Sequence, residues 1–123
     1  MPRPTILVVD DDADIRSVLG EVLRDERYTV VEAGDGGEAL SLMAAMDTQP
    51  ALVLLDLMMP QVDGWEFRRR QLLDPQLAPT PVVIISAFAP SDSGSHELFA
   101  DTVRLRKPVD LDKLLQVVRS HVA

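Results

Sequence analysis

The sequence contains no cysteine, which excludes disulfides, thiolate zinc sites and thiol catalysis. It also lacks a long apolar run, since the longest, residues 51–55, is far too short to cross a bilayer. Residues 1–9 have neither the length nor the small-residue cleavage site of a signal peptide. We therefore expect a cytoplasmic protein without membrane insertion, whose chemistry uses oxygen and nitrogen atoms.

Basic side chains are also scarce, with 12 Lys and Arg against 20 Asp and Glu and a net charge of -8. A nucleic-acid surface needs clustered basic groups to displace counterions from phosphates, so we expect no direct nucleic-acid partner. The arginine run 68–70 falls on a predicted helix and is interpreted as a solvated face. The acidic excess does not argue against binding a divalent cation.

Short β-branched apolar segments alternate with segments of helical periodicity along the 123 residues. The predicted strands are 5–9, 29–33, 51–55, 81–85 and 103–106, and the clear helices are about 15–23, 36–46, 64–73 and 111–122. The segment 89–95 holds a proline, a glycine and three serines, and is a poor helix sequence.

This alternation predicts one domain of the α/β class: a doubly wound, open sheet of five parallel strands with about five helices on its two faces. Asp12 and Asp110 are placed to cap the first and last helices, and Asp63 with Gly64 is interpreted as the turn and cap that open the third. In such sheets ligands bind at the carboxyl ends of the strands. The residues just past each strand are therefore the candidates for function.

Charged and hydroxyl side chains occupy those positions. They are Asp10, Asp11 and Asp12 after the first strand, Asp56 after the third, Ser86 after the fourth and Lys107 with Pro108 after the fifth. Converging carboxylates repel each other by ~3 kcal/mol per pair at ~5 Å and an effective dielectric of ~20. Mg²⁺ or Mn²⁺ would neutralise them and leave positions open for phosphate oxygens. The lysine and the hydroxyl would then hold a phosphoryl group by charge and by hydrogen bond.

Each residue alone has an ordinary structural explanation. Asp56 could be a turn residue, Ser86 a loop hydroxyl and Lys107 a surface charge, and only their joint position favours function. Strand alternation points Asp10 and Asp12 the same way, so periodicity does not select the metal-binding pair. The two histidines, His96 and His121, have no partners at catalytic spacing and are interpreted as surface residues. No glycine-rich loop of the dinucleotide or triphosphate type accompanies the site.

Four segments together resemble the receiver domain of two-component response regulators. They are the acidic turn Ile-Leu-Val-Val-Asp-Asp-Asp at 6–12, Leu-Asp-Leu-Met-Met-Pro at 55–60 continuing to Asp-Gly at 63–64, Ile-Ser-Ala at 85–87 and Arg-Lys-Pro at 106–108. The resemblance covers nearly all of 6–122. It implies a flavodoxin-like (βα)5 fold with strand order 2-1-3-4-5 and a single receiver domain over 1–123. That length leaves no room for an output domain, so we expect signalling by docking or a chain cut from a longer protein.

The resemblance also implies roles for the strand-end residues. Asp56 is similar to the phosphoacceptor and Asp11 to the direct metal ligand. Asp10 corresponds to a second acid that reaches the metal through water, and the backbone carbonyl of Met58 would complete the protein's share of the coordination. These assignments imply a bound Mg²⁺ or Mn²⁺ ion.

The remaining roles concern the phosphoryl group. Ser86 matches the hydroxyl that moves onto a phosphoryl oxygen, and Lys107 the cation that pairs with the aspartate or its phosphate. The Lys107–Pro108 peptide bond is expected to be cis. The implied donor is a histidine kinase or histidine phosphotransfer protein, and an unidentified protein target would dock near the fourth and fifth strands. Such a protein is a phosphoacceptor that assists its own phosphorylation and dephosphorylation, and is not otherwise an enzyme.

One position departs from the family pattern. Many receivers carry an aromatic residue three positions before the lysine, and here that position holds Arg104. An arginine cannot enter an apolar pocket without a partner, so we expect Arg104 on the surface and an output face that communicates by charge or by loop order.

Two other functions remain open from the residues. A phosphohydrolase resembling the haloacid-dehalogenase class would use Asp10 and Asp12 with Ser86 and Lys107, although the chain is short for that class. It also lacks an acidic pair at the end of a further strand. A receiver-like docking module that never needs phosphorylation is the other alternative.

Overall fold

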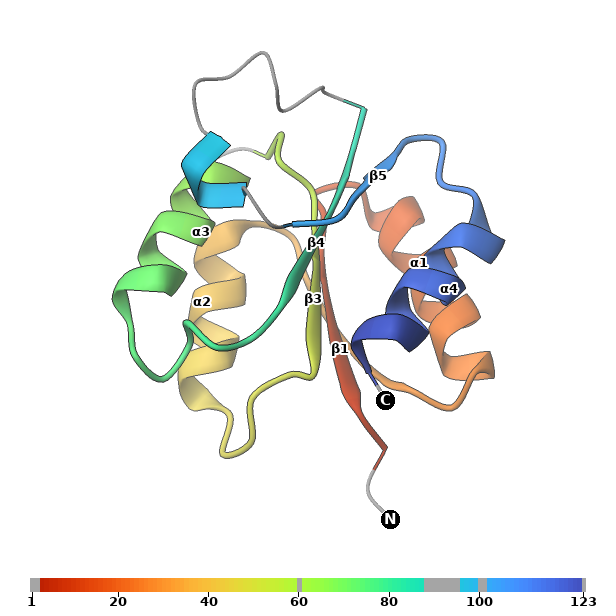
Figure 1. The fold of residues 1–123 in the computed structure, drawn as a ribbon, viewed down its shortest axis with the longest axis horizontal. Coiled ribbons are helices and arrows are strands. Elements are labelled where there is room, and N and C mark those ends of the chain that lie inside the picture. The colour runs from red at the N-terminus through yellow and green to blue at the C-terminus, as the bar shows by residue number, and fades with distance from the viewer. Residues whose placement is uncertain (1–2, 60, 88–95, 100–101, 123) are drawn as a thin grey trace.

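The computed structural model describes residues 3–59, 61–87, 96–99 and 102–122 (Figure 1). Its strands are β1 (Thr5–Val9), β2 (Thr29–Ala33), β3 (Leu52–Leu55), β4 (Val82–Ser86) and β5 (Arg104–Arg106). Its α-helices are α1 (Ala13–Asp25), α2 (Gly36–Ala45), α3 (Gly64–Leu73) and α4 (Leu111–His121), and the short 3-10 helix η2 (His96–Phe99) precedes β5. No helix in these ranges is long and apolar enough to cross a membrane.

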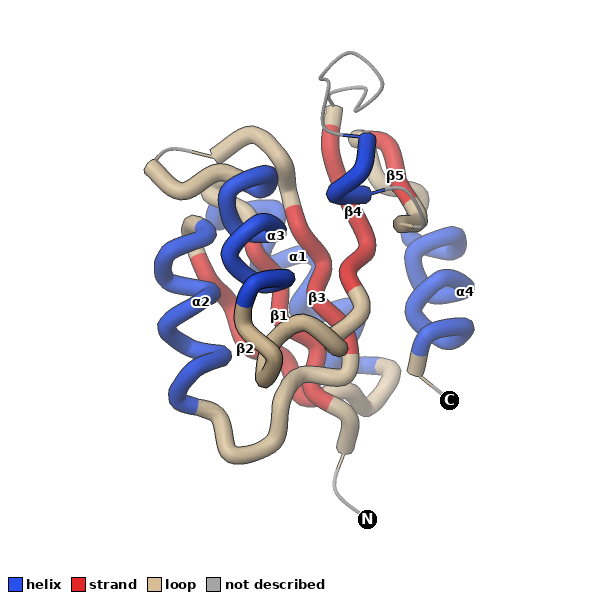
Figure 2. The backbone as a smooth tube through the Cα atoms, turned by 60° about the vertical axis from the view of Figure 1, so that its left-hand side comes forward, coloured by secondary structure: helices blue, strands red, loops and turns tan. Residues whose placement is uncertain are grey.

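The strands form one parallel sheet in the order β2-β1-β3-β4-β5. Helices α2 and α3 cover one face, and α1 and α4 cover the other (Figures 1 and 2). The doubly wound fold and the strand order 2-1-3-4-5 are therefore confirmed. Because the chain winds outward in opposite directions from β1, the carboxyl ends of β1 and β3 lie at the switch point where ligands of such sheets bind.

Each face of the sheet has its own hydrophobic core. In β1, Leu7 and Val9 belong to the cluster that includes residues of α2 and α3, whereas Ile6 and Val8 belong to the cluster with α1 and α4. Successive side chains of a strand point to opposite faces, so an uninterrupted apolar run fills both cores at once. All four residues of β3 are buried, as predicted for a central strand.

Aspartates cap the helices that lead away from the strand ends. The side chain of Asp12 accepts hydrogen bonds from the backbone N–H groups of Asp14 and Ile15, and Asp63 and Asp110 cap α3 and α4 in the same way. These three caps were predicted. The capped helices begin directly after the loops that carry the candidate site, which fixes where those loops end.

The observed elements differ from expectation in small ways. Ser86 is the last residue of β4 and pairs in register with Arg106, so it belongs to the strand and does not follow it. Between β4 and β5 the described residues contain only η2, and the poor helix sequence 89–95 lies outside the described residues. The run 68–70 is only partly a solvated face, because Arg68 is half-buried and its Nε donates to the carbonyl of Leu98 at 3.1 Å.

Candidate functional site

The two central strands deliver two buried aspartates to one place. Asp10 follows β1 and Asp56 follows β3, and Val9 and Leu55 are partners in the register of these neighbouring strands. The backbone N–H of Asp56 donates to the carbonyl of Val9 at 2.9 Å, which continues the ladder beyond the strand. Asp10 is 2% exposed and Asp56 5%. Carboxylates buried to this degree need compensating charge.

A third carboxylate completes an acidic cluster. One oxygen from each of Asp10, Asp11 and Asp56 lies within 4.8 Å of the other two, and Asp11 is on the exposed side. At an effective dielectric of ~20, each such pair repels by ~3 kcal/mol. The predicted convergence of strand-end carboxylates is present. Asp12 does not join them, since its side chain caps α1.

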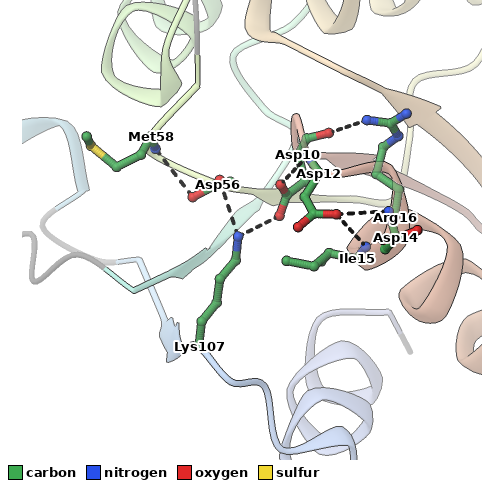
Figure 3. A network of polar contacts seen from close by, with 8 residues as sticks. All are labelled: Asp10, Asp12, Asp14, Ile15, Arg16, Asp56, Met58 and Lys107. Carbon is green, nitrogen blue, oxygen red and sulfur yellow. Dashed lines mark hydrogen bonds and ion pairs between the residues drawn. The ribbon is translucent and has the colours of Figure 1, made fainter.

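Lys107 brings positive charge to this cluster from the end of β5 (Figure 3). Its Nζ lies 2.8 Å from Oδ2 of Asp10 and 3.3 Å from Oδ2 of Asp56. Its backbone N–H donates to the carbonyl of Ser86 at 3.2 Å, and its peptide bond to Pro108 is cis, as the resemblance implied. Three carboxylates and one ammonium leave the cluster with excess negative charge.

The ionisation of these groups reflects that imbalance. Burial raises the pKa of Asp56, and the neighbouring charge of Asp10 raises it further, against the opposing effects of Lys107 and the Met58 N–H group. Burial alone would lower the pKa of Lys107, but its hydrogen bonds and attraction to Asp10 and Asp56 outweigh burial and raise it. The raised pKa of Lys107 favours its charged form, whereas the raised pKa of Asp56 disfavours its charged form. Additional positive charge beside Asp56 would oppose this effect.

A cleft of about 310 Å³ adjoins the acidic cluster. Asp56, Met58, Ser86, Ala87 and Lys107 line it, so a carboxylate, a hydroxyl-bearing residue and an ammonium border one space. Ser86 is 4% exposed and Met58 is 55% exposed. The backbone N–H of Met58 donates to Oδ1 of Asp56 at 3.3 Å. The set has the chemistry to bind a small tetrahedral anion next to a carboxylate nucleophile.

One residue at the site was not predicted from the sequence. Nη1 of Arg16, in the first turn of α1, donates to the carbonyl of Asp10 at 2.6 Å (Figure 3). Its Nε lies 3.4 Å from Glu32 on β2. Arg16 lies one helical turn beyond the cap residue Asp12, and this spacing is the sequence feature that places it near the site. The spacing does not reveal in which direction a long side chain runs.

Arg104, the residue that departs from the family pattern, lies on the surface. Arg104 is exposed, and its Nη2 lies 3.5 Å from the carbonyl of Phe99, a core residue that is 1% exposed. This agrees with the prediction for Arg104. Of the two histidines, His121 is partly buried with its Nδ1 2.8 Å from the carbonyl of Val117, so the surface assignment is only partly right for it. The side chain of His96 lies outside the part that the structure describes.

Comparison with known proteins agrees with this geometry. The family model for the response regulator receiver domain matches residues 6–119. The chain belongs to this family. It is a receiver domain of the two-component type, a phosphoacceptor class whose members pair with histidine kinases or phosphotransfer proteins and bind Mg²⁺ in an acidic pocket. The match favours the receiver interpretation over the phosphohydrolase.

Individual relatives span different lengths. The chain is 34% identical over 125 residues to sporulation initiation phosphotransferase F of Bacillus subtilis, covering 99% of this chain and 96% of that protein. It is 35% identical over 126 residues to the DNA-binding dual master transcriptional regulator RpaA of Synechocystis, covering 95% of this chain but only 48% of that one. The response regulator TrrA of Thermotoga maritima, in complex with Mg²⁺-BeF, superposes with a TM-score of 0.82 at 28% identity, covering 97% and 99% of the two chains.

Proposed function

We propose that this receiver domain is a phosphoaccepting switch in which Asp56 takes the phosphoryl group from the phosphohistidine of a histidine kinase or histidine phosphotransfer protein. The observation that carries this proposal is the convergence of Asp10, Asp11 and Asp56 within 4.8 Å of one another, with the Nζ of Lys107 bonded to two of them. Asp56 is the member of the cluster that also lines the adjoining cleft.

The donor set fits Mg²⁺ or Mn²⁺. Its atoms are carboxylate oxygens, which hard divalent cations prefer, and the exposed side at Asp11 leaves room for retained waters. Summing three carboxylates and one ammonium gives a charge that a divalent ion would cancel. We assign Asp11 and Asp56 as direct ligands, Asp10 as a ligand through water and the carbonyl of Met58 as the backbone ligand. A divalent ion held by these residues would supply positive charge that offsets the negative charge developing in the transfer.

The chain's own residues account for the rest of the transfer. An oxygen of Asp56 forms a bond to phosphorus while the bond from phosphorus to the donor imidazole nitrogen breaks, and the nitrogen keeps the electron pair. Lys107, held in its charged form, offsets negative charge on the phosphoryl oxygens. The hydroxyl of Ser86 donates a hydrogen bond to one of them. Because the residue that takes the phosphoryl group belongs to the protein itself, the protein assists its own modification and is not otherwise an enzyme.

Output follows from the charge that the phosphoryl group adds, roughly -1.5 to -2 if it behaves like other phosphoryl modifications. Ser86 ends β4 and Lys107 follows β5. Partner docking near these two strands would therefore be the first property to respond to the added charge. The exposed Arg104 is the first residue of β5 and belongs to the surface that a partner would meet. The proposal also includes a cytoplasmic location, no nucleic-acid contact, no membrane insertion and one receiver domain over residues 1–123.

Phosphorylation by acetyl phosphate tests the acceptor. With Mg²⁺ present, intact-mass measurement is expected to show one added phosphoryl group on the wild type and none on Asp56→Asn. Asp12→Asn is the matched control, because it changes an aspartate that caps α1 and lies outside the acidic cluster. A mass shift that persists in Asp56→Asn would place the acceptor elsewhere, and no Mg²⁺ binding by calorimetry would favour the phosphorylation-independent docking module.

A further inference from the structure

Asp10 is held at two separate points by two cations. Lys107 binds its carboxylate, whereas Arg16 binds its backbone carbonyl from the opposite side of the acidic turn (Figure 3). The proposed chemistry uses Lys107 but gives no role to Arg16. An arginine that donates to a metal-site backbone from a helix outside the cluster requires a separate explanation.

The contact made by Arg16 fixes a peptide unit that joins two proposed metal-site residues. Its Nη1 lies 2.6 Å from the carbonyl oxygen of Asp10, and that oxygen belongs to the planar unit that continues to the nitrogen of Asp11. On the other side of the residue, the N–H of Asp10 donates to the carbonyl of Ala33 on β2 at 3.1 Å. Holding the Asp10 carbonyl therefore limits the direction in which the Asp11 side chain leaves the turn.

Arg16 is itself held in place from the sheet. Its Nε lies 3.4 Å from Oε1 of Glu32, so the guanidinium spans from β2 to the acidic turn. A charge-assisted fork of this kind has a defined orientation that a single ammonium does not provide. The side chain is 21% exposed, which protects these bonds from solvent more than at a typical surface arginine.

Arg24, on the same helix, offers an internal comparison. Its Nη2 lies 3.5 Å from the other oxygen of Glu32, and its side chain is 51% exposed. In the part of the chain that the structure describes, no hydrogen bond joins Arg24 to residues 10–12. The two arginines share an acidic partner on β2 but differ in whether they reach the acidic turn.

We propose that Arg16 is a positioning residue for the divalent cation: by holding the Asp10 carbonyl against β2, it keeps the carboxylates of Asp10 and Asp11 directed at one ion. This inference rests on the proposed function, because it assumes that the acidic cluster binds Mg²⁺. Arg16 itself contacts neither the ion nor the phosphoryl group. Its effect is on metal affinity, through the orientation of the ligands.

Calorimetric titration with MgCl₂, repeated with MnCl₂, tests the proposal on the wild type, Arg16→Gln, Arg16→Lys and Arg24→Gln. We expect Arg16→Gln to raise the Mg²⁺ Kd about 10-fold, at the lower end of what loss of an outer-shell partner costs a metal site. Arg16→Lys should fall between Arg16→Gln and the wild type, since an ammonium can donate to one of the two acceptors but lacks the fork. Arg24→Gln should stay within about twofold of the wild type, as expected for an exposed ion pair.

A second readout separates ligand orientation from general stability. With acetyl phosphate, Arg16→Gln should be phosphorylated poorly at low Mg²⁺ and as well as the wild type at saturating Mg²⁺, because added metal compensates for weaker binding. Circular dichroism before titration shows that each variant is folded. If Arg16→Gln does not fold, Arg16→Lys carries the test.

The outcomes distinguish this inference from the proposed function. A wild-type Mg²⁺ Kd in Arg16→Gln, or in Arg16→Lys where only that variant folds, overturns the role of Arg16 alone. A loss of Mg²⁺ affinity in Arg24→Gln as large as that in Arg16→Gln also overturns the role of Arg16. The shared effect would then come from the ion pairs with Glu32 and not from the bond to the Asp10 carbonyl. A wild type that binds no Mg²⁺ overturns the proposed function and this inference together.

Discussion

The Nζ of Lys107 lies closer to Asp10 than to Asp56, at 2.8 Å against 3.3 Å. Asp10 therefore serves as the anchor of the ammonium, and Asp56 shares it from a longer distance. This arrangement leaves the proposed acceptor incompletely neutralised. It also places the ammonium beside the proposed acceptor.

Removal of the ammonium should destabilise the protein in the absence of metal. In Lys107→Met the carboxylates of Asp10 and Asp56 lose their common partner, and we expect a loss of roughly 2 kcal/mol in the free energy of unfolding, less than for a fully buried pair because Lys107 is 18% exposed. Urea unfolding at pH 7 measures this loss. Added Mg²⁺ should recover much of it by restoring positive charge.

The control for this substitution is Lys113→Met on α4, where the lysine is exposed. Its free energy of unfolding should change by less than about 0.5 kcal/mol, with or without Mg²⁺. Equal losses in Lys107→Met and Lys113→Met would show that the carboxylate pair does not depend on Lys107.

The raised pKa of Asp56 predicts a pH dependence of stability. A carboxyl group with a higher pKa in the folded state binds its proton more tightly there than in the unfolded chain, so stability decreases as pH rises from the unfolded pKa through the folded pKa. Below the unfolded value the effect is absent. Asp56→Asn removes the ionisable group and with it this part of the pH dependence.

At pH 7 without metal, Asp56→Asn should therefore be more stable than the wild type by about 1 kcal/mol, because the cost of burying a charged carboxylate and its repulsion from Asp10 are both removed. Urea unfolding of both proteins across pH 4 to 8, with and without Mg²⁺, measures the difference. Mg²⁺ should reverse the order, since it binds and stabilises only the wild-type cluster strongly. A less stable Asp56→Asn in the absence of metal would contradict the prediction.

The parts of the site that could be predicted are those that depend on backbone position. Asp10 and Asp56 come directly after apolar strands, and parallel strands must bring their carboxyl ends to one edge. Asp12 has the residue type and the position of a helix N-cap, so its role could also be predicted. Short side chains at defined backbone positions leave few alternative directions.

Long side chains account for most of what could not be predicted. Nothing in the sequence assigns a role to Arg16, and Arg68 is interpreted there as part of a solvated face, yet Arg16 reaches the Asp10 carbonyl and Arg68 the carbonyl of Leu98. Their guanidinium groups extend several bonds from the helix, and neighbouring elements decide where they go. Helical periodicity describes only the face from which they start. The choice of Asp11 over Asp12 for the cluster likewise depended on the family resemblance, because strand alternation points Asp10 and Asp12 the same way and does not select Asp11.

The cap and the metal cluster can be separated by substitution in the acidic turn. Asp12→Ala removes the acceptor for the N–H groups of Asp14 and Ile15 and should lower the free energy of unfolding by about 1 kcal/mol. Its Mg²⁺ affinity should remain near that of the wild type, because Asp12 lies outside the acidic cluster. Asp11→Ala should give the opposite result, with lost Mg²⁺ binding and little loss of stability. Urea unfolding and calorimetry on both variants test this, and loss of Mg²⁺ binding in Asp12→Ala would place that residue in the cluster.

Ser86 should affect the transfer step and not the binding of metal. It lines the cleft beside Asp56 and Lys107 but lies outside the group of carboxylates that could hold an ion. In Ser86→Ala the hydrogen bond to the phosphoryl oxygen is lost as charge develops on it, and we expect phosphorylation by acetyl phosphate to slow by about 100-fold, the scale found when one such donor is removed. The Mg²⁺ Kd should stay unchanged. Ser86→Thr keeps the hydroxyl on a residue suited to a strand and should retain most of the rate. Equal rates in the wild type and Ser86→Ala, measured at saturating Mg²⁺, would remove Ser86 from the transfer and leave Lys107 as the group that meets the phosphoryl oxygens.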